Sequence, residues 1–450
     1  MYVLKNALIV TMDPQRRVIR NGHLWIEADR IVRIGPAAEL GLPPEPYDSF
    51  DASSMIALPG FISAHNHLYS AVVRSLPYGG PAEETDATFI SWIERFWFKY
   101  LEDVVNEEDL YVGTLVNCLD QIRSGITTSA DTVEGSGALP GALEAAARGM
   151  EDSGIRGLVG YEVTGRLGEK IAQLGLEDNI RLFEKTKDRG ARVEGCFNLH
   201  TTFSCSTELI QQVTQEARRR GARRIQMHCC DDHWHSFDTT RRFGKRAVKY
   251  LEDIGFLGPD VLLAHCSYID QFKDPKILAQ HQVKVSHQAE SNAIFGFWPD
   301  MSRLLEAGVT VGLGVDGMTH SMFEVMRTAQ MIHRIRYYNI TMFPDQQLLE
   351  MATLGSAKCL GKENQVGSLE VGKKADVVLL DNRSTVPLFE NNIYNHIVGS
   401  CDRADVNSIL IDGRLVVEDR QFIHLDERAA RERCQKAALA LWERNDWPTP

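Results

Sequence analysis

The chain has 450 residues, of which 44% are apolar and 24% are charged. This is the balance of an ordinary soluble protein, and the length suits one large domain or a large and a small domain. The 49 basic and 61 acidic residues give a net charge of −12, so nucleic acids and anionic membranes are poor candidates as partners.

Features absent from the sequence indicate the compartment. No run of about 18 apolar residues is present to span a membrane. The first residues, Met1 to Lys5, do not follow the order of a signal peptide. The nine cysteines are scattered without any Cys-x-x-Cys pair, which is typical of reduced thiols. We therefore expect a cytoplasmic protein with no membrane or nucleic-acid partner.

Short β-rich segments punctuated by turn residues occur at both ends of the chain. They cover residues 2–10, 23–27, 30–34, 375–381, 406–410 and 414–418. Asp412-Gly413 between the last two is a hairpin signal. We predict a small β-sandwich domain built from residues 1–57 and 366–425, followed by a charged, helix-prone tail over 426–450.

The middle of the chain alternates between short apolar runs and segments with helical periodicity. The apolar runs are 55–67, 125–133, 157–163, 193–203, 224–230, 261–267, 283–289 and 309–316. Strands that alternate with helices indicate a parallel α/β sheet. Eight such units fit a (β/α)₈ TIM-type barrel over residues 58–365, with a doubly wound sheet as the alternative.

Ionisable residues end several of these predicted strands. His65 and His67 end the first, and an i, i+2 spacing points both side chains to one face. His228, His265 and Asp316 end the fifth, sixth and eighth strands. The carboxyl ends of barrel strands share one rim, so four histidines and an aspartate there predict a metal site.

At this point the sequence resembles the amidohydrolase superfamily. The resemblance rests on Pro59-Gly60-Phe61-Ile62 before the His65-x-His67 pair, on His228, His265 and Asp316, and on the late segment 366–376. The chain looks like the branch that contains cytosine deaminase and the triazine hydrolases, and most of all like the SsnA-type aminohydrolases. The likeness extends nearly from end to end.

The resemblance implies a role for each of these residues. His65, His67, His228 and Asp316 would bind one divalent metal ion per chain, with Zn²⁺ as the first expectation and Fe²⁺ as the alternative. The metal would lower the pKa of bound water toward ~7 and supply hydroxide at neutral pH. Asp316 would accept the proton of the water, and His265 would orient it and stabilise the developing oxyanion.

One residue departs from the family pattern. Related deaminases have a glutamate three residues after the fifth-strand histidine, where this chain has Asp231. We expect Asp231 to carry protons to the leaving group, with a surface turn as the alternative. His200, His287 and Glu162 are expected to contact the substrate. The alternatives are buried structural histidines and, for Glu162, an ion pair with Arg166.

Two further patterns have competing interpretations. Trp92, Phe96, Trp97 and Phe98 have helical spacing, which favours a core or a subunit interface over an aromatic clamp. Residues 312–317 fit the G-x-G-x-x-G pattern of dinucleotide-binding proteins, but no acid lies near 20 residues later.

We therefore predict a metal-dependent hydrolase of carbon–nitrogen bonds other than peptide bonds. Its substrate would be a small nitrogen-rich heterocycle, and the reaction removal of an amine. Opening of a cyclic amide or urea, displacement of a halide or thiolate, and a barrel that binds without turnover are the alternatives. Family members often pair, so we expect a homodimer or a higher homo-oligomer.

Overall fold

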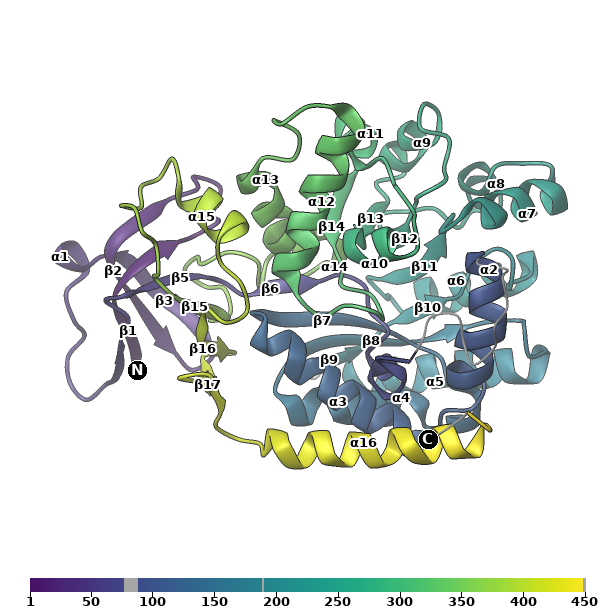
Figure 1. Ribbon diagram of the computed structural model, residues 1–450, viewed down its shortest axis with the longest axis horizontal. Coiled ribbons are helices and arrows are strands. Elements are labelled where there is room, and N and C mark those ends of the chain that lie inside the picture. The colour runs from purple at the N-terminus through teal and green to yellow at the C-terminus, as the bar shows by residue number, and fades with distance from the viewer. Residues whose placement is uncertain (77–87, 188–189, 448–450) are drawn as a thin grey trace.

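The computed structural model describes residues 1–76, 88–187 and 190–447. Two separate sheets organise these residues (Figure 1). One is a closed parallel barrel, and the other is a mixed sheet contributed by both ends of the chain. The predicted fold class, an α/β barrel with a small β domain made from both termini, is confirmed.

The terminal sheet joins its strands in the order β18-β17-β16-β15-β5-β1-β2-β3, with β4 beside β1. Its strands are β1 Tyr2–Val10, β2 Val18–Glu27, β3 Arg30–Pro36, β4 Asp48–Asp51, β5 Met55–Pro59, β15 Val377–Asp381, β16 Val406–Ile411, β17 Arg414–Glu418 and β18 Gln421–Phe422. The early and late parts of the chain meet where β5 pairs antiparallel with β15. Leu4, Ile9, Leu24, Val377 and Leu379 form part of its own apolar core.

The barrel strands follow the order β6-β7-β8-β10-β11-β12-β13-β14, with β9 also beside β8. They are β6 Phe61–Ser63, β7 Ile126–Val133, β8 Arg156–Val163, β9 Val193–Gly195, β10 Phe197–Leu199, β11 Ile225–Cys229, β12 Val261–His265, β13 Lys284–His287 and β14 Thr310–Leu313. The Ala64 amide donates to the Leu313 carbonyl at 2.9 Å and joins the first strand to the last. This closure rules out the doubly wound alternative.

The predicted first barrel strand, 55–67, is divided in the structure. Residues up to Pro59 belong to the terminal sheet, and the barrel begins at Phe61. Gly60 lies between them, where a Cβ atom would be 2.0 Å from Oγ1 of Thr127. The division therefore depends on a glycine that lets the chain pass close to β7.

Helices surround the barrel and link its strands. In the first half they are η1 Leu68–Val73, α2 Phe89–Trp92, η2 Ile93–Glu102, α3 Glu107–Arg123, η3 Ser136–Ala138, α4 Ala142–Ser153, α5 Glu169–Thr186 and α6 Thr207–Arg219. In the second half they are α7 His233–Phe243, α8 Ala247–Asp253, α9 Asp274–Gln280, α10 Ala289–Ile294, α11 Met301–Glu306, α12 Met322–Tyr337, α13 Asp345–Glu350, η4 Met351–Gly355 and α14 Ser356–Leu360. The helices α1 Ala37–Leu40, α15 Ile393–Gly399 and α16 Glu427–Arg444 lie outside the barrel repeat.

The last helix, α16, runs along the barrel surface against α3 and η1 (Figure 1). The Trp442 indole donates to the Val72 carbonyl at 3.0 Å and fixes α16 to η1. Among the described residues, none of the helices combines the length and apolar character needed to cross a membrane. The nine cysteines all lie in the described residues, and each is buried and free.

Candidate active site

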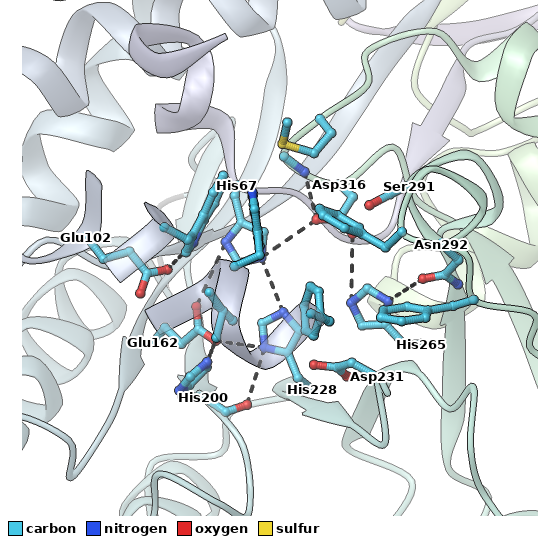
Figure 2. A pocket seen from close by; sticks show the side chains of 18 residues that line it. His67, Glu102, Glu162, His200, His228, Asp231, His265, Ser291, Asn292 and Asp316 are labelled. Atoms are coloured by element: carbon cyan, nitrogen blue, oxygen red, sulfur yellow. Dashed lines mark hydrogen bonds and ion pairs between the residues drawn. The ribbon is translucent and has the colours of Figure 1, made fainter. Parts of the chain in front are cut away.

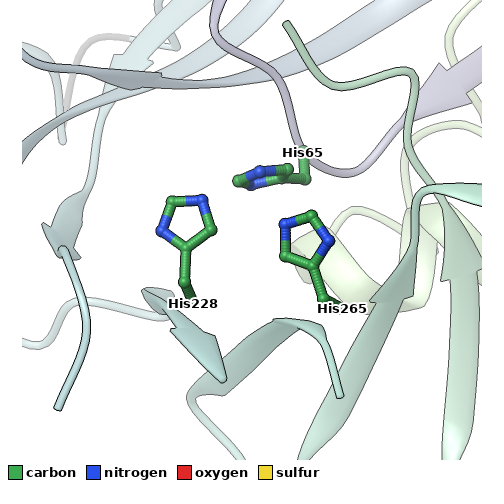
Figure 3. A group of neighbouring side chains, drawn as sticks. All are labelled: His65, His228 and His265. Atoms are coloured by element: carbon green, nitrogen blue, oxygen red, sulfur yellow. The ribbon is translucent and has the colours of Figure 1, made fainter. Parts of the chain in front are cut away.

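The ionisable residues predicted from the strand ends do meet at one rim of the barrel. His65 and His67 directly follow β6, His228 is near the end of β11, His265 ends β12, and Asp316 follows β14. The rings of His65, His228 and His265 face a common centre (Figure 3). Ligand atoms within each of two triads, one with these three histidines and one with His65, His67 and Asp316, lie within 4.8 Å of one another.

The spacing inside this cluster differs from that of direct pairing. Asp316 carboxylate oxygens lie 3.8 Å from Nε2 of each of His65, His67 and His265. These separations are too long for hydrogen bonds. The Nε2 atoms of His67 and His228, in contrast, approach each other to 3.2 Å. All five residues are buried.

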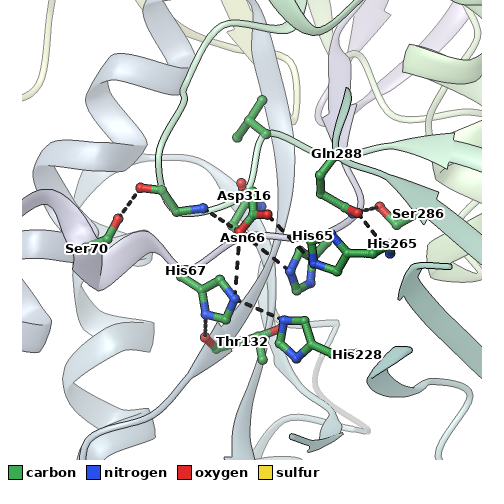
Figure 4. A network of polar contacts seen from close by, with 12 residues as sticks. His65, Asn66, His67, Ser70, Thr132, His228, His265, Ser286, Gln288 and Asp316 are labelled. Atoms are coloured by element: carbon green, nitrogen blue, oxygen red, sulfur yellow. Dashed lines mark hydrogen bonds and ion pairs between the residues drawn. The ribbon is translucent and has the colours of Figure 1, made fainter. Parts of the chain in front are cut away.

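Contacts on the far side of the rings orient them. His67 Nδ1 lies 3.0 Å from the Thr132 carbonyl, His228 Nδ1 lies 2.7 Å from a Glu162 oxygen, and His265 Nδ1 lies 2.8 Å from Asn292 Oδ1. Figure 4 shows the His67 contact within the surrounding network. A ring that donates from Nδ1 presents the Nε2 lone pair to the centre, as metal-binding histidines do.

This arrangement fits a divalent cation. Nε2 of His65 is buried and has no hydrogen-bond partner among the described residues. Two imidazole nitrogens that face each other at 3.2 Å, with a carboxylate nearby, are a donor set suited to zinc or iron(II). The chemistry of the donors therefore agrees with the predicted metal site.

Two members of the cluster have unusual backbone conformations. His265 has a φ of 70° and Asp316 a φ of 64°, a left-handed region that non-glycine residues seldom adopt. Such strain concentrates at functional sites, where surrounding structure enforces it. Both residues line the pocket, so the two strained positions coincide with the candidate site.

Charge couples Glu162 to the histidines. Burial disfavours the ionised form of Glu162, but His228 and His200 outweigh it and lower the pKa of Glu162 to about 2. Burial also disfavours the charged form of His228, and Glu162 more than compensates and raises the pKa of His228. A metal ion bound at Nε2 would displace the proton that this ring otherwise holds. Glu162 thus lies behind His228 as an ionised partner, and the alternative ion pair with Arg166 does not form: Arg166 contacts Glu102, Asp103 and Glu134.

A pocket opens over the cluster (Figure 2). It is lined by His67, Phe89, Trp92, Ile93, Trp97, Glu102, Glu162, His200, His228, Asp231, His265, Ser291, Asn292, Phe295, Phe297, Asp316, Gly317 and Met318. Asp231 is only 6% exposed, which contradicts a surface turn. Its Oδ1 is buried without a hydrogen-bond partner among the described residues, so a carboxylate oxygen is available at the pocket.

The three residues predicted to contact substrate are placed differently. His200 and Glu162 line the pocket, and burial lowers the pKa of His200 to about 3, which makes its ring neutral. His287 is fully buried at the end of β13 beside His333 and is not among the lining residues. The structure therefore brings two of the three to the pocket.

The aromatic residues of α2 and η2 require a correction. Their helical spacing favoured a core or interface position, and Phe96 and Phe98 are indeed in the core. Trp97 belongs to the same core but also lines the pocket, as Trp92 does, and their ring centroids are 5.3 Å apart. Phe295 also lines it, with its ring centroid 4.7 Å from that of Trp92. The same periodicity serves a core face and a pocket wall, so spacing alone did not separate them.

Sequence reasoning also missed Glu102. This glutamate ends η2, is 2% exposed and accepts hydrogen bonds from the Trp97 indole at 2.6 Å and the Tyr69 hydroxyl at 3.0 Å. Burial and the nearby Glu162 raise the pKa of Glu102 to about 7. Because Glu102 is followed by Asp103, the sequence suggests an acidic segment in contact with solvent. No motif indicated that Glu102 lies in the pocket.

Comparison with known proteins agrees with this geometry. The model of the Amidohydrolase family matches residues 56–416. The chain is 33% identical to the 5'-deoxyadenosine deaminase of Methanosarcina barkeri, with 98% of each chain covered. It is 31% identical to the 5-methylthioadenosine/S-adenosylhomocysteine deaminase of Pelotomaculum thermopropionicum, covering 98% of this chain and 99% of the relative.

Solved structures share the fold. A zinc-bound adenosine deaminase from Xanthomonas campestris superposes with a TM-score of 0.87 at 20% identity, covering 98% of each chain. The zinc complex of atrazine chlorohydrolase TrzN from Arthrobacter aurescens has a TM-score of 0.82 at 21% identity, covering 97% of this chain and all of that one (100%).

The dinucleotide-binding alternative for residues 312–317 fails, because Asp316 and Gly317 line the pocket and α12 begins only at Met322. The chain belongs to the amidohydrolase family and is a hydrolase of carbon–nitrogen bonds other than peptide bonds.

Proposed function

We propose that this protein is a metal-dependent deaminase of an adenine nucleoside modified at its 5' position, in the class of 5'-deoxyadenosine and 5-methylthioadenosine. The observation that carries the proposal is the group of inward-facing imidazoles and Asp316 beneath an aromatic pocket. The substrate class is supported by relatives named for these nucleosides, which match the chain over 98% of its length.

His65, His67, His228 and Asp316 would bind one divalent ion, zinc in preference to iron(II). When bound, the ion would supply Lewis acidity and make water available as hydroxide at neutral pH. The unpartnered Nε2 of His65 and the opposed Nε2 atoms of His67 and His228 support these assignments. His265 contacts Asn292 through Nδ1, and we assign its Nε2 to orienting the water.

The reaction replaces an exocyclic amine with oxygen. Water adds to the ring carbon that bears the amine, and Asp316 accepts one proton from it. The histidines that surround Asp316 lower its pKa against the effect of burial, so the carboxylate is ionised and able to accept. Both water protons are used: Asp231 takes up the second one and the one held by Asp316, and it passes one to the ring nitrogen and one to the departing nitrogen. That nitrogen leaves as ammonia with the electron pair of the C–N bond.

The pocket wall suits a flat heterocycle. Trp92, Trp97 and Phe295 offer faces on which a purine ring can stack, and such stacking contributes about 1–3 kcal/mol per base. His200 and Glu102 line the same pocket as polar contacts for the substrate. His287 retains only the sequence argument as a substrate residue.

Several finer expectations belong to the same proposal. The likeness to SsnA-type aminohydrolases, a homodimer or higher homo-oligomer, and a cytoplasmic location stay predictions. The nine free, buried cysteines support a reducing compartment.

Ammonia release tests the proposal. The purified enzyme is incubated with 5'-deoxyadenosine, 5-methylthioadenosine, S-adenosylhomocysteine and adenosine, alongside cyclic ureas and chlorotriazines. We expect ammonia and the matching hypoxanthine nucleoside from at least one adenine nucleoside. Ring opening or chloride release, with no ammonia from any nucleoside, would replace the deaminase with one of the other hydrolase classes.

A further inference from the structure

A second cavity lies at the opposite end of the barrel, where strands begin. Its lining includes Leu158 near the start of β8, Cys196 after β9, Arg224 before β11, and Gly361 and Lys362 after α14. Its volume is about 280 Å³, far above the roughly 10–15 Å³ that one water needs. Of the five residues named here, none belongs to the proposed catalytic site.

Arg224 is the exceptional residue of this cavity. It is only 4% exposed, and its Nε and Nη1 atoms are buried without a hydrogen-bond partner among the described residues. A Cβ atom on Gly361 would lie 3.4 Å from its Nη2, so the guanidinium lies against that glycine. A buried arginine is normally paired, because an isolated buried charge is costly.

The charged residues near Arg224 form no ion pair with it in the part of the chain that the structure describes. Lys362 is paired with Glu194 at 2.5 Å, and Lys187 with Glu184 at 2.6 Å. Burial lowers the pKa of Arg224, and burial together with the charge of Arg224 lowers that of Lys284. Asp260 and Glu363 lie near enough to oppose the effect of burial on the pKa of Arg224, but Asp260 is paired with Arg218 at 2.8 Å. Among the described residues, neither Arg224 nor the exposed Arg223 on the same lining forms an ion pair with a carboxylate.

Another cavity lined by arginines shows how such side chains are usually paired with acids. It lies between the barrel, the terminal sheet and α16 and is lined by Arg123, Arg420 and Arg431, among others. These three pair with Glu427, Asp381 and Asp120, respectively. These three arginines are matched by acids, whereas no ion pair of Arg224 with an acid is found among the described residues.

We propose that Arg224, with Arg223, forms a binding site for a phosphate-class oxyanion at the amino-terminal end of the barrel. A phosphate monoester is mostly doubly charged at neutral pH, and inorganic phosphate carries between one and two negative charges, so either suits two neighbouring arginines. A guanidinium binds such oxygens through parallel N–H groups. The ligand is inorganic phosphate or the phosphate group of a monoester.

Equilibrium binding to the metal-loaded enzyme tests this site. Isothermal titration with inorganic phosphate and with ribose 5-phosphate compares the native chain, Arg224→Gln, and the control Arg403→Gln in the other arginine-rich cavity. Charged hydrogen bonds of this kind are worth about 1.5–3 kcal/mol, so Arg224→Gln should weaken binding roughly ten- to hundredfold. Arg403→Gln should leave it unchanged. The tighter of the two ligands identifies the source of the phosphate.

Two results would overturn the proposal. One is equal binding by the native chain and Arg224→Gln, which would place the anion elsewhere, for instance at the metal. The other is no binding of either ligand by the native chain. If Arg224→Gln does not fold, Arg224→Lys keeps the charge without the planar fork. It should bind phosphate more weakly than the native chain, and equal affinity would again contradict the site.

Discussion

Two buried clusters of ionisable residues in this molecule are built in opposite ways. Where the barrel meets the terminal sheet, Arg156 contacts Asp376 at 2.7 Å and Asp412 at 2.8 Å. At the carboxyl ends of the strands, Asp316 stays 3.8 Å from three imidazoles. We call the first the closed cluster, because Arg156 is paired directly with Asp376 and Asp412. We call the second the open cluster, because Asp316 and the four histidines His65, His67, His228 and His265 surround a shared centre.

The difference separates structural charges from functional ones. Direct pairing offsets part of the cost of burying these charges without any bound ion. Asp316 and the imidazoles around it converge without forming ion pairs, so they are stable only if something else satisfies them, here the proposed cation. Burial alone does not distinguish the clusters, since Arg156 and His65 are both buried; the contact distances do.

The largest expected effect is on the open cluster. Replacing His228 by Ala removes one proposed metal ligand, so metal content and ammonia release should both collapse. We expect a rate at least about a thousandfold lower, because metal chemistry supplies several kcal/mol of barrier reduction. Elemental analysis and an ammonia assay check it. His281→Ala, whose ring is 32% exposed, is the control; a His228→Ala enzyme that keeps one metal per chain would contradict the assignment.

Breaking the closed cluster should lower the free energy of unfolding. Arg156→Ala leaves Asp376 and Asp412 without their main partner, and breaking such a buried pair costs about 3–5 kcal/mol. Urea unfolding of the native and variant chains measures this. Activity per folded molecule should change little, because Arg156 is far along β8 from the pocket end. A loss below about 1 kcal/mol would show that the pairing is not what stabilises this junction.

Substitution of Asp231 tests whether this aspartate, which stands where related deaminases have a glutamate, takes part in catalysis. Asp231→Asn should lower kcat at least about a hundredfold, the usual scale for a lost proton-transfer group, with metal content unchanged. Asp232→Asn is a matched control, because Asp232 caps α7 by accepting from the His235 amide at 2.8 Å and asparagine caps equally well. Equal kcat values for the two variants would remove Asp231 from the mechanism.

The smallest effect concerns Glu162. Glu162→Gln keeps the shape but removes the charge behind His228, and such outer contacts typically change metal affinity by about 10- to 100-fold. Competition with a chelator measures the affinity. If affinity is unchanged while KM rises, Glu162 contacts substrate instead of orienting His228.

The sequence was sufficient to predict the barrel and the residues at its rim. Alternation of strands and helices indicated the fold, and the strand-end positions of His65, His67, His228, His265 and Asp316 predicted their convergence, because parallel strands end on one face. These signals depend only on local periodicity and topology.

The rest depends on packing that spacing does not encode. Trp92 and Trp97 follow a helical pattern equally typical of a core, and Glu102 resembles a surface acid in a charged segment. Arg224 follows Arg218, Arg219, Arg220 and Arg223, a run that reads as solvated charge. Only the structure shows that Arg224 alone among these five is almost fully buried.

The most direct test is the metal content of the purified protein, measured by mass spectrometry after zinc or iron(II) is supplied. The open cluster predicts one divalent ion per chain, lost together with ammonia release on chelation and restored with it. A chain that takes up no metal under either condition would contradict the central claim, because the inward-facing donors would then be satisfied by something other than a cation.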